Sequence, residues 1–148
     1  MIREGLYPLP FFWYIQFMEL RPSYRYKAQC VRVIDGDTIV VDIDLGFETI
    51  LKNRHIRLNG YNAAELTATD PKERDRAGQA TAMLTALIGG KECVIETIKT
   101  KAGVERQTLG RYVADVYQYC FPDKSINQHM AEFCAQLSQD VDADSDAT

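Results

Sequence analysis

A tight turn between two strand-like segments is the feature that most constrains the fold of this chain. The segment after the turn carries apolar residues on one face with the period of two that is typical of a strand: Ile39, Val41 and Ile43. The segment before it is also strand-like, but its apolar positions change face near Cys30. A bulge or sharp bend explains this change, and small closed barrels need such bends. Between the segments, Asp35-Gly36 predicts a hairpin turn whose two central residues adopt positive φ.

Five strands and two helices are predicted along the chain. The strands cover residues 24–34, 38–44, 50–61, 92–98 and 111–119, and the helices cover residues 77–88 and a segment that begins at Ser125. Ser125 forms a predicted capping box with Gln128. The polar residues 66–76 hold Pro71 and are expected to be an exposed loop. This order favours a mainly β protein with α, in which a five-stranded closed barrel carries two flanking helices.

The length of 148 residues suits one domain with a peripheral segment at each end. We expect an N-terminal extension over residues 1–22, a barrel domain over residues 23–138, and a disordered acidic tail over residues 139–148. The apolar run at residues 6–18 is too short to span a bilayer, and no small-residue cleavage site follows it. The sequence therefore favours a cytoplasmic protein over a secreted one, with no membrane association. An alternative is that translation starts at Met18.

Net charge and cysteine content leave the function open. The net charge is −4, and four aspartates of the tail balance it: Asp140, Asp142, Asp144 and Asp146. A remainder near zero neither supports nor excludes a nucleic-acid partner. The four cysteines lack CxxC pairs and zinc-ligand spacing, so we expect buried free thiols and a reducing compartment.

Residue types suited to metal and phosphate chemistry come together in one part of the sequence. Asp37 follows the tight turn, and Arg57, Asn62 and Glu65 return within one short run. Arg111 follows later, at the start of a predicted strand. Oxygen-bearing side chains can hold a hard cation, and arginine can hold a phosphate. Each residue alone also fits turn chemistry or a solvated strand face, but their joint order and spacing indicate a metal-assisted phosphodiesterase.

Four segments, in this order, resemble the staphylococcal nuclease (thermonuclease) family: VRVIDGDTI, RLNGYNAAEL, LGRYVADVY and INQHMAEF. The resemblance covers about Lys27 to Gln136, and its most specific part is IDGDT followed by R-L-x-G-x-[DN]-x-x-E. It implies an OB-fold barrel with flanking helices and Ca²⁺-dependent hydrolysis of DNA or RNA phosphodiesters. We expect a monomer that acts on nucleic acid.

Carried over residue by residue, the resemblance implies a calcium site formed by Asp37, Asn62 and the backbone carbonyl of Ala63. Asn62 stands where the family commonly has an aspartate, which removes one negative charge from the site. An asparagine oxygen still suits calcium, so the change concerns affinity rather than ligation.

The same resemblance implies catalytic roles for three residues and substrate contacts for three. Glu65 is expected to orient or deprotonate the attacking water. Arg57 and Arg111 are expected to bind the phosphate and to stabilise its charge in the transition state. Leu109 occupies a position that is often a tyrosine in the family, so its contact with the terminal nucleotide is expected to be weaker.

Two alternatives to an active nuclease remain from the sequence. The first is a noncatalytic OB-fold module that binds nucleic acid or protein through a basic groove and stacking aromatics. The second is a truncated, poorly folded fragment. The joint presence of Asp37, Glu65 and two arginines favours the enzyme, because a binding module has no need of the acids.

Overall fold

The first hairpin joins β1 (Arg25–Asp35) and β2 (Thr38–Asp44), where the sequence predicted two strands. In the computed structural model, which describes residues 21–145, the register of this pair shifts after Cys30 and again after Val33. The irregularity predicted near Cys30 is therefore confirmed, and it bends β1. The bent strand pairs with β2 along one edge and with β4 along the other.

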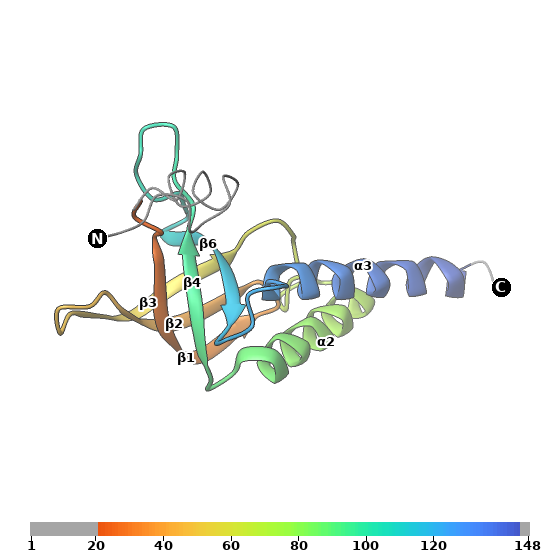
Figure 1. Ribbon diagram of the computed structural model, residues 1–148. Coiled ribbons are helices and arrows are strands. Elements are labelled where there is room, and N and C mark those ends of the chain that lie inside the picture. Colours follow the sequence, from red (N-terminus) through yellow and green to blue (C-terminus); the bar gives the residue numbers. More distant parts are fainter. Residues whose placement is uncertain (1–20, 146–148) are drawn as a thin grey trace, which may run out of the picture.

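A parallel pairing between β3 and β6 closes the sheet into a barrel. The remaining strands are β3 (Ile50–Leu58), β4 (Glu92–Thr97), β5 (Gln107–Thr108) and β6 (Arg111–Gln118). Their order is β3-β2-β1-β4-β6-β5, with the additional pairing of β3 to β6. Five strands thus form a closed, OB-fold-like barrel, and β5 extends it as a hairpin with β6 (Figure 1). The predicted five-stranded barrel is confirmed, whereas the short strand β5 was not predicted.

Helix α2 (Pro71–Ile88) connects β3 to β4 and begins earlier than the sequence predicted. The expected loop over residues 66–76 is wrong in its second half, because Pro71 starts the helix instead of preventing it. Proline suits the first helical position, where its missing N–H has no helical partner to lose. The side chain of Asp70 caps the helix by accepting a hydrogen bond from the N–H of Lys72, with a distance of 3.1 Å.

Helix α3 (Ile126–Ser145) follows β6 and lies beside α2, with its second half extending past the barrel (Figure 1). The capping box is confirmed: the N–H of Gln128 donates to Ser125 Oγ, and the N–H of Ser125 donates to Gln128 Oε1. The helix continues to Ser145, past residue 139 from which a disordered tail was predicted. Composition favoured disorder there, but a helix that is already formed gains one hydrogen bond for each residue added. Residues 1–20 and 146–148, which hold most of the predicted extension and the end of the tail, lie outside the described residues.

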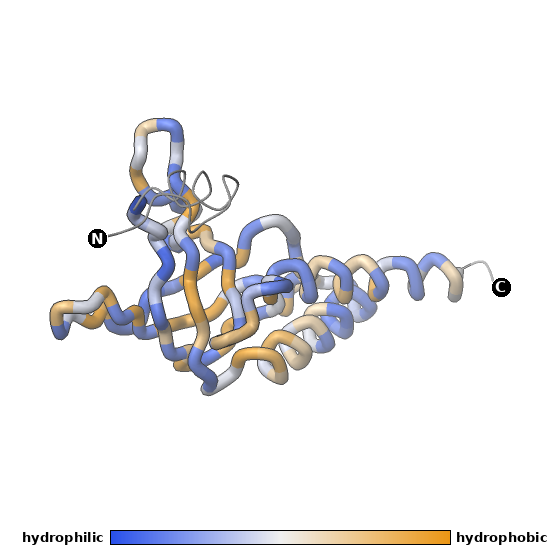
Figure 2. The backbone as a smooth tube through the Cα atoms, viewed as in Figure 1, coloured by the Kyte–Doolittle hydropathy of each residue, from blue (hydrophilic) through white to orange (hydrophobic). Residues whose placement is uncertain are grey.

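Apolar side chains from the strands and both helices form one core. The residues predicted to share one face of β2, Ile39, Val41 and Ile43, are buried, and so are Ile56 and Leu58 of β3. In Figure 2 apolar segments concentrate in the strands, in α2 and in the part of α3 nearest the barrel, while the far part of α3 is mostly hydrophilic. Neither helix that the structure describes is long and apolar enough to cross a membrane.

The cysteines are free thiols, but only two of them are fully buried as predicted. Cys30 and Cys93 are buried in the barrel, and Cys134 is half-buried on α3. Cys120 is exposed. It lies in the turn after β6 with a φ of 67°, beyond the part of the strand that faces the core.

The turn between β1 and β2 differs from the predicted one. Asp35 pairs with Thr38, so Gly36 and Asp37 are the two turn residues, and neither has a positive φ. Gly36 is required for space instead. A Cβ atom on Gly36 would lie 2.6 Å from Cβ of Ala80 on α2 and 2.7 Å from Cβ of Ala63 in the loop after β3. The missing side chain therefore lets the helix and the loop close on the turn.

We expect Gly36→Ala to destabilise the protein by about 1–3 kcal/mol, because the added methyl group has no space between two rigid alanines. The matched control is Gly78→Ala on the exposed side of α2, where an added Cβ has nothing within 4 Å. The control should gain about 0.5–1 kcal/mol from its higher helix propensity. Urea denaturation followed by circular dichroism measures both changes. A Gly36→Ala variant as stable as the parent would show that the turn is not closely packed.

Candidate functional site

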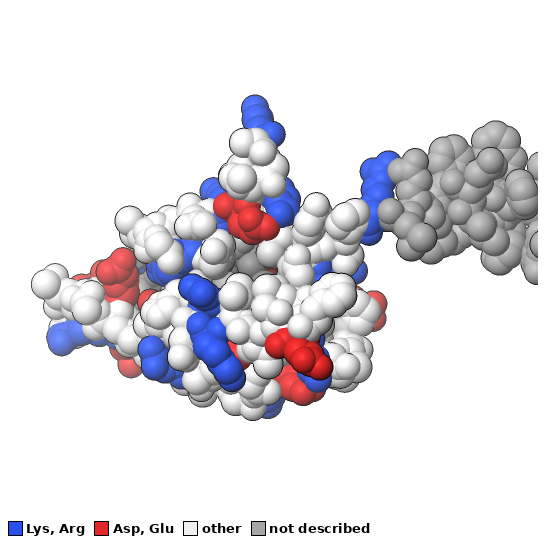
Figure 3. Space-filling model, turned by 90° about the vertical axis from the view of Figure 1, so that its left-hand side faces the viewer, with Lys and Arg blue, Asp and Glu red and all other residues white. Residues whose placement is uncertain are grey.

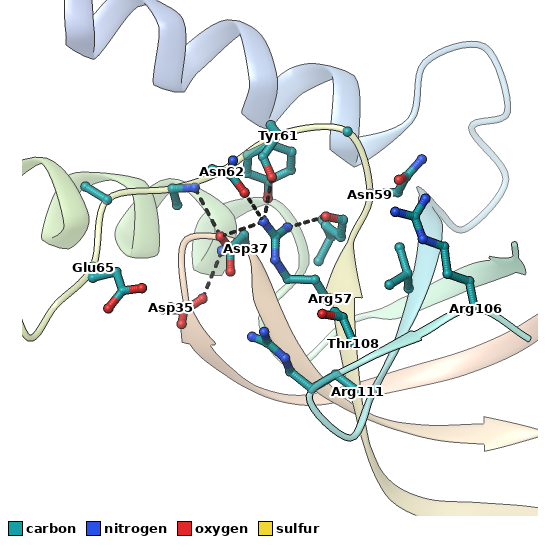
Figure 4. Close-up of a pocket in the computed structure, with 15 residues that line it drawn as sticks. Asp35, Asp37, Arg57, Asn59, Tyr61, Asn62, Glu65, Arg106, Thr108 and Arg111 are labelled. Carbon is teal, nitrogen blue, oxygen red and sulfur yellow. Dashed lines mark hydrogen bonds and ion pairs between the residues drawn. The ribbon is translucent and has the colours of Figure 1, made fainter.

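A polar pocket of about 650 Å³ lies where three segments of the barrel meet. These segments are the β1–β2 turn, the end of β3 with the loop that follows it, and the β5–β6 hairpin (Figure 4). Its charged and polar lining includes Asp35, Asp37, Arg57, Asn62, Glu65, Arg106, Thr108 and Arg111. Residues far apart in the sequence thus face one cavity.

Arg57 occupies the centre of the pocket and is held by four oxygens, three of them on one nitrogen (Figure 4). Its Nη2 donates to the carbonyl of Tyr61 at 2.7 Å and to Oδ1 of Asn62 at 2.6 Å. The same nitrogen lies 3.3 Å from Oδ2 of Asp37, in an ion pair whose side chains are only 14% and 13% exposed. Nη1 donates to the carbonyl of Leu58. Oxygens from the turn and from the loop therefore converge on one cationic nitrogen.

Asp37 is held from several sides by groups that orient its carboxylate. The N–H of Ala63 donates to Oδ2 at 3.1 Å, and the hydroxyl of Thr38 donates to Oδ1 at 3.0 Å. The N–H of Asp37 in turn donates to Oδ1 of Asp35 at 3.0 Å. Partial burial raises the pKa of Asp35 above its ordinary value, and the neighbouring Asp37 carboxylate contributes in the same direction. The pocket thus concentrates negative charge on one side of Arg57.

Arg111 reaches the same network from β6. Its Nη1 donates to Oγ1 of Thr38 at 3.0 Å, so the Thr38 hydroxyl links Arg111 to Asp37. The Nε of Arg111 is buried, and it has no hydrogen-bond partner among the described residues. A buried donor without an acceptor is costly, and an anion in the pocket is a suitable acceptor for it.

Two hydrogen-bonded anchors hold the loop after β3 in place. The hydroxyl of Tyr61 donates to the carbonyl of Gly36 at 2.7 Å, and burial raises the pKa of Tyr61 well above its ordinary value, so this donor keeps its proton. At the start of the loop, Nδ2 of Asn127 donates to the carbonyls of Asn59 at 2.9 Å and Ala114 at 3.0 Å. Asn127 is 5% exposed and ties α3, β6 and the loop together.

All but one of the residues predicted for the site line this pocket. Six of them lie there: Asp37, Arg57, Asn62, Ala63, Glu65 and Arg111. Glu65 and Asn62 are exposed, whereas Asp37, Arg57 and Arg111 are half-buried. Leu109 is not part of the lining. It lies at the tip of the β5–β6 hairpin and is 91% exposed, so its substrate contact stays a prediction.

Sequence analysis missed Arg106, Thr108 and Asp35. The first two escaped because the β5–β6 turn consists of Leu109 and Gly110, with φ of 48° and 75°, and leucine rarely adopts this conformation. A two-residue turn at this point would have placed Thr108 opposite Arg111, as observed. Asp35 carried a signal, because it lies two residues before Asp37 across a tight turn.

No protein-family model matches the chain, and no curated protein matches it either. The residues of the pocket are therefore the basis on which a function can be assigned.

The donor set of the pocket fits a hard cation such as calcium. Asp37 and Asn62 carry oxygen atoms in the pocket, the ligand type that calcium prefers, and the Ala63 carbonyl would add a third. Oxygens of Asp37 and Asn62 already converge on the cationic Nη2 of Arg57. The same two oxygens can therefore stabilise a positive charge. Among residues 21–145, no cluster of three or more His, Cys, Asp or Glu residues is arranged to hold a metal. The cation would therefore have few charged ligands and several neutral ones, including water.

We expect Asn62→Asp to tighten calcium binding by roughly tenfold, because calcium affinity increases with the number of charged ligands. Only the Oδ1 atom of Asn62 is hydrogen-bonded to a described residue, so the aspartate loses no observed donor bond. Asn53→Asp, which adds the same charge on β3 outside the pocket, is the control. Calorimetric titration with calcium measures both variants. Unchanged affinity in a well-folded Asn62→Asp protein would mean that Asn62 is not a ligand.

Proposed function

We propose that the protein is a calcium-dependent nuclease that hydrolyses phosphodiester bonds of DNA or RNA, as its resemblance to the staphylococcal nuclease family implies. The observation that supports this most strongly is the single pocket that holds Asp37, Glu65, Arg57 and Arg111. Hydrolysis of a phosphodiester requires roughly 20 kcal/mol of barrier reduction, which no single group supplies. The four residues offer distinct contributions to that reduction.

The two arginines act on the phosphate. Guanidinium groups donate in a planar fork that matches the oxygens of a phosphate, and they keep their charge at any physiological pH. Arg111 has a buried Nε without an acceptor among the described residues, and a phosphate oxygen would provide one. Arg57 is held at the pocket by Asp37 and Asn62 through Nη2, and its Nε–H forms no hydrogen bond with a described residue, which leaves this donor for a phosphate oxygen.

Glu65 acts on water. Its side chain is exposed at the end of the pocket away from Arg106, in the loop after β3 (Figure 4). A carboxylate at this position can accept a proton from a water molecule and align that water for attack on phosphorus. The hydrogen bond from Tyr61 to Gly36 and the contact of Ala63 with Asp37 hold the loop, so that Glu65 keeps its place relative to the arginines.

Asp37, Asn62 and the carbonyl of Ala63 are the groups that would hold calcium. When bound, the cation polarises a phosphoryl oxygen and offsets the charge that develops in the transition state. Because Asp37 and Asn62 also bond Arg57, the cation and Arg57 compete for the same oxygens. The all-oxygen donor set favours calcium over zinc, which prefers nitrogen and sulfur ligands.

A noncatalytic module that binds nucleic acid is the second candidate. The observation that favours it is the small number of charged metal ligands among the described residues. Its electrostatic support is limited, because positive and negative side chains are interspersed on the face of the barrel shown in Figure 3. Such a module would bind nucleic acid without cutting it, so that a cleavage assay separates the two functions.

We expect the purified protein to cut plasmid DNA or a structured RNA in calcium and to stop when the cation is chelated, because charge offset by the cation is lost. Gel electrophoresis of the products measures this. A protein with both arginines replaced, purified in parallel, controls for contaminating nucleases. Digestion that continues in excess EDTA would contradict the proposed calcium dependence, and no digestion under any divalent cation would favour the binding module.

We expect Arg57→Lys and Arg111→Lys each to lower kcat by about 10²-fold or more, because lysine is a point charge that cannot donate as a fork to transition-state charge. Arg54→Lys is the matched control, since Arg54 is exposed on β3 outside the pocket. Initial cleavage rates and far-UV circular dichroism are measured together. A folded variant that retains most of its activity would remove that arginine from the proposed mechanism.

A further inference from the structure

The β5–β6 hairpin presents a third arginine to the pocket. Thr108 lies directly opposite Arg111. Arg106 lies two residues before Thr108, just outside β5, and its carbonyl accepts from the N–H of Val113 at 2.9 Å, so it continues the same face of the hairpin. Alternate residues of paired strands share one face. Arg106, Thr108, Arg111 and Val113 accordingly all line the pocket.

Arg106 combines a fixed backbone with an available side chain. Its N–H donates to the carbonyl of Ile98 at 2.7 Å, and its own carbonyl is bonded to β6, so both sides of the residue are held. The residue is exposed, and its guanidinium forms no hydrogen bond or ion pair with the residues that the structure describes. Arg57 and Arg111, by contrast, are half-buried, and they are bonded to Asn62 and Thr38 respectively. Arg106 therefore has a fixed backbone and a guanidinium group that remains available for a ligand.

The position of Arg106 fits a phosphate next to the one held by Arg57 and Arg111. Arg106 is diagonal to Arg111 across the hairpin, a relation that places Cα atoms about 7–8 Å apart. Two arginines anchored at this separation can each reach a different phosphate of the same polynucleotide strand. In Figure 4, Arg106 and Glu65 lie at opposite ends of the pocket, with Arg57 and Arg111 between them.

We propose that Arg106 binds the phosphate adjacent to the scissile one, on the leaving-group side, and thereby makes an extended polynucleotide strand the preferred substrate over an isolated phosphodiester. The side follows from geometry: attacking water and leaving oxygen lie on opposite faces of phosphorus, and Glu65 is at the far end from Arg106. This assignment rests on the proposed function for the position of the scissile phosphate.

Arg106→Gln and a matched control, Lys101→Gln, test the proposal. Lys101 is exposed in the β4–β5 connection, which protrudes at the top of Figure 3 with a basic side chain at its tip, and it does not line the pocket. The substrates are a short single-stranded oligonucleotide and the p-nitrophenyl ester of a nucleoside phosphate, which has one phosphodiester and no neighbouring phosphate. Both are assayed with the full chain in calcium.

We expect Arg106→Gln to lower kcat/KM about tenfold more on the oligonucleotide than on the single ester, chiefly through KM, because one charge-assisted contact is lost. The slope of log kcat/KM against log salt should become shallower by about 0.7 on the oligonucleotide, the value for one phosphate contact on a single strand. Lys101→Gln should change both substrates equally. Equal losses on both substrates in Arg106→Gln, or the same substrate preference in Lys101→Gln, would overturn the proposal.

Equilibrium binding of a fluorescent oligonucleotide in EDTA separates this proposal from the proposed function. If the parent binds in EDTA but does not cut in calcium, and Arg106→Gln alone weakens binding and reduces its salt slope, the contact of Arg106 stands and hydrolysis fails. If the parent cuts and Arg106→Gln behaves like Lys101→Gln on both substrates, hydrolysis stands and the Arg106 contact fails. A parent that neither binds nor cuts overturns both.

Discussion

The close approach at Gly36 is the contact on which the rest of the pocket depends. Ala80 of α2 and Ala63 of the loop after β3 both reach the turn because Gly36 has no Cβ atom. The same turn accepts two hydrogen bonds from the loop. The Tyr61 hydroxyl donates to the Gly36 carbonyl, and the N–H of Ala63 donates to the Asp37 carboxylate. Packing and hydrogen bonding therefore act on the same few atoms. A loop without regular secondary structure becomes a defined wall of the pocket because a hairpin and a helix hold it from two sides.

Electrostatics inside the pocket follows from this arrangement. The turn and the loop bring oxygens together, and the protein balances them with Arg57, whose side chain is as poorly exposed as that of Asp37. A buried ion pair is a weak source of stability, because the loss of hydration offsets much of the attraction. Its value here lies in position: it keeps an arginine and a carboxylate side by side. Arg111 joins them through Thr38, a buried residue of β2 whose hydroxyl accepts from Arg111 and donates to Asp37.

Much of the fold was accessible from sequence, because local rules and tertiary packing agree there. Alternation located the core strands, the change of face located the bend at Cys30, and the capping box located α3. The failures occur where a local rule had two outcomes. Pro71 can break a helix or begin one, and here it begins α2. Gly36 can supply a positive φ or space for a close contact, and the positions of Ala63 and Ala80 show that space is what it supplies. In the pocket, motif spacing placed Arg57 and its neighbours together. The position of Arg106 could not be predicted, because the β5–β6 turn contains Leu109 at a positive φ that leucine rarely adopts.

The parallel pairing of β3 with β6 also has a consequence for folding kinetics. It joins residues 56–58 to residues 112–114, with α2 and β4 between them in the sequence. Closing so long a segment costs entropy before any contact repays it, so non-local pairings of this kind form late and slow the folding of small domains. Arg57 lies in the paired part of β3, and Arg111 is the first residue of its partner strand β6. In a nascent or partly unfolded chain Arg57 and Arg111 are therefore not yet side by side, and the pocket is complete only when the barrel has closed.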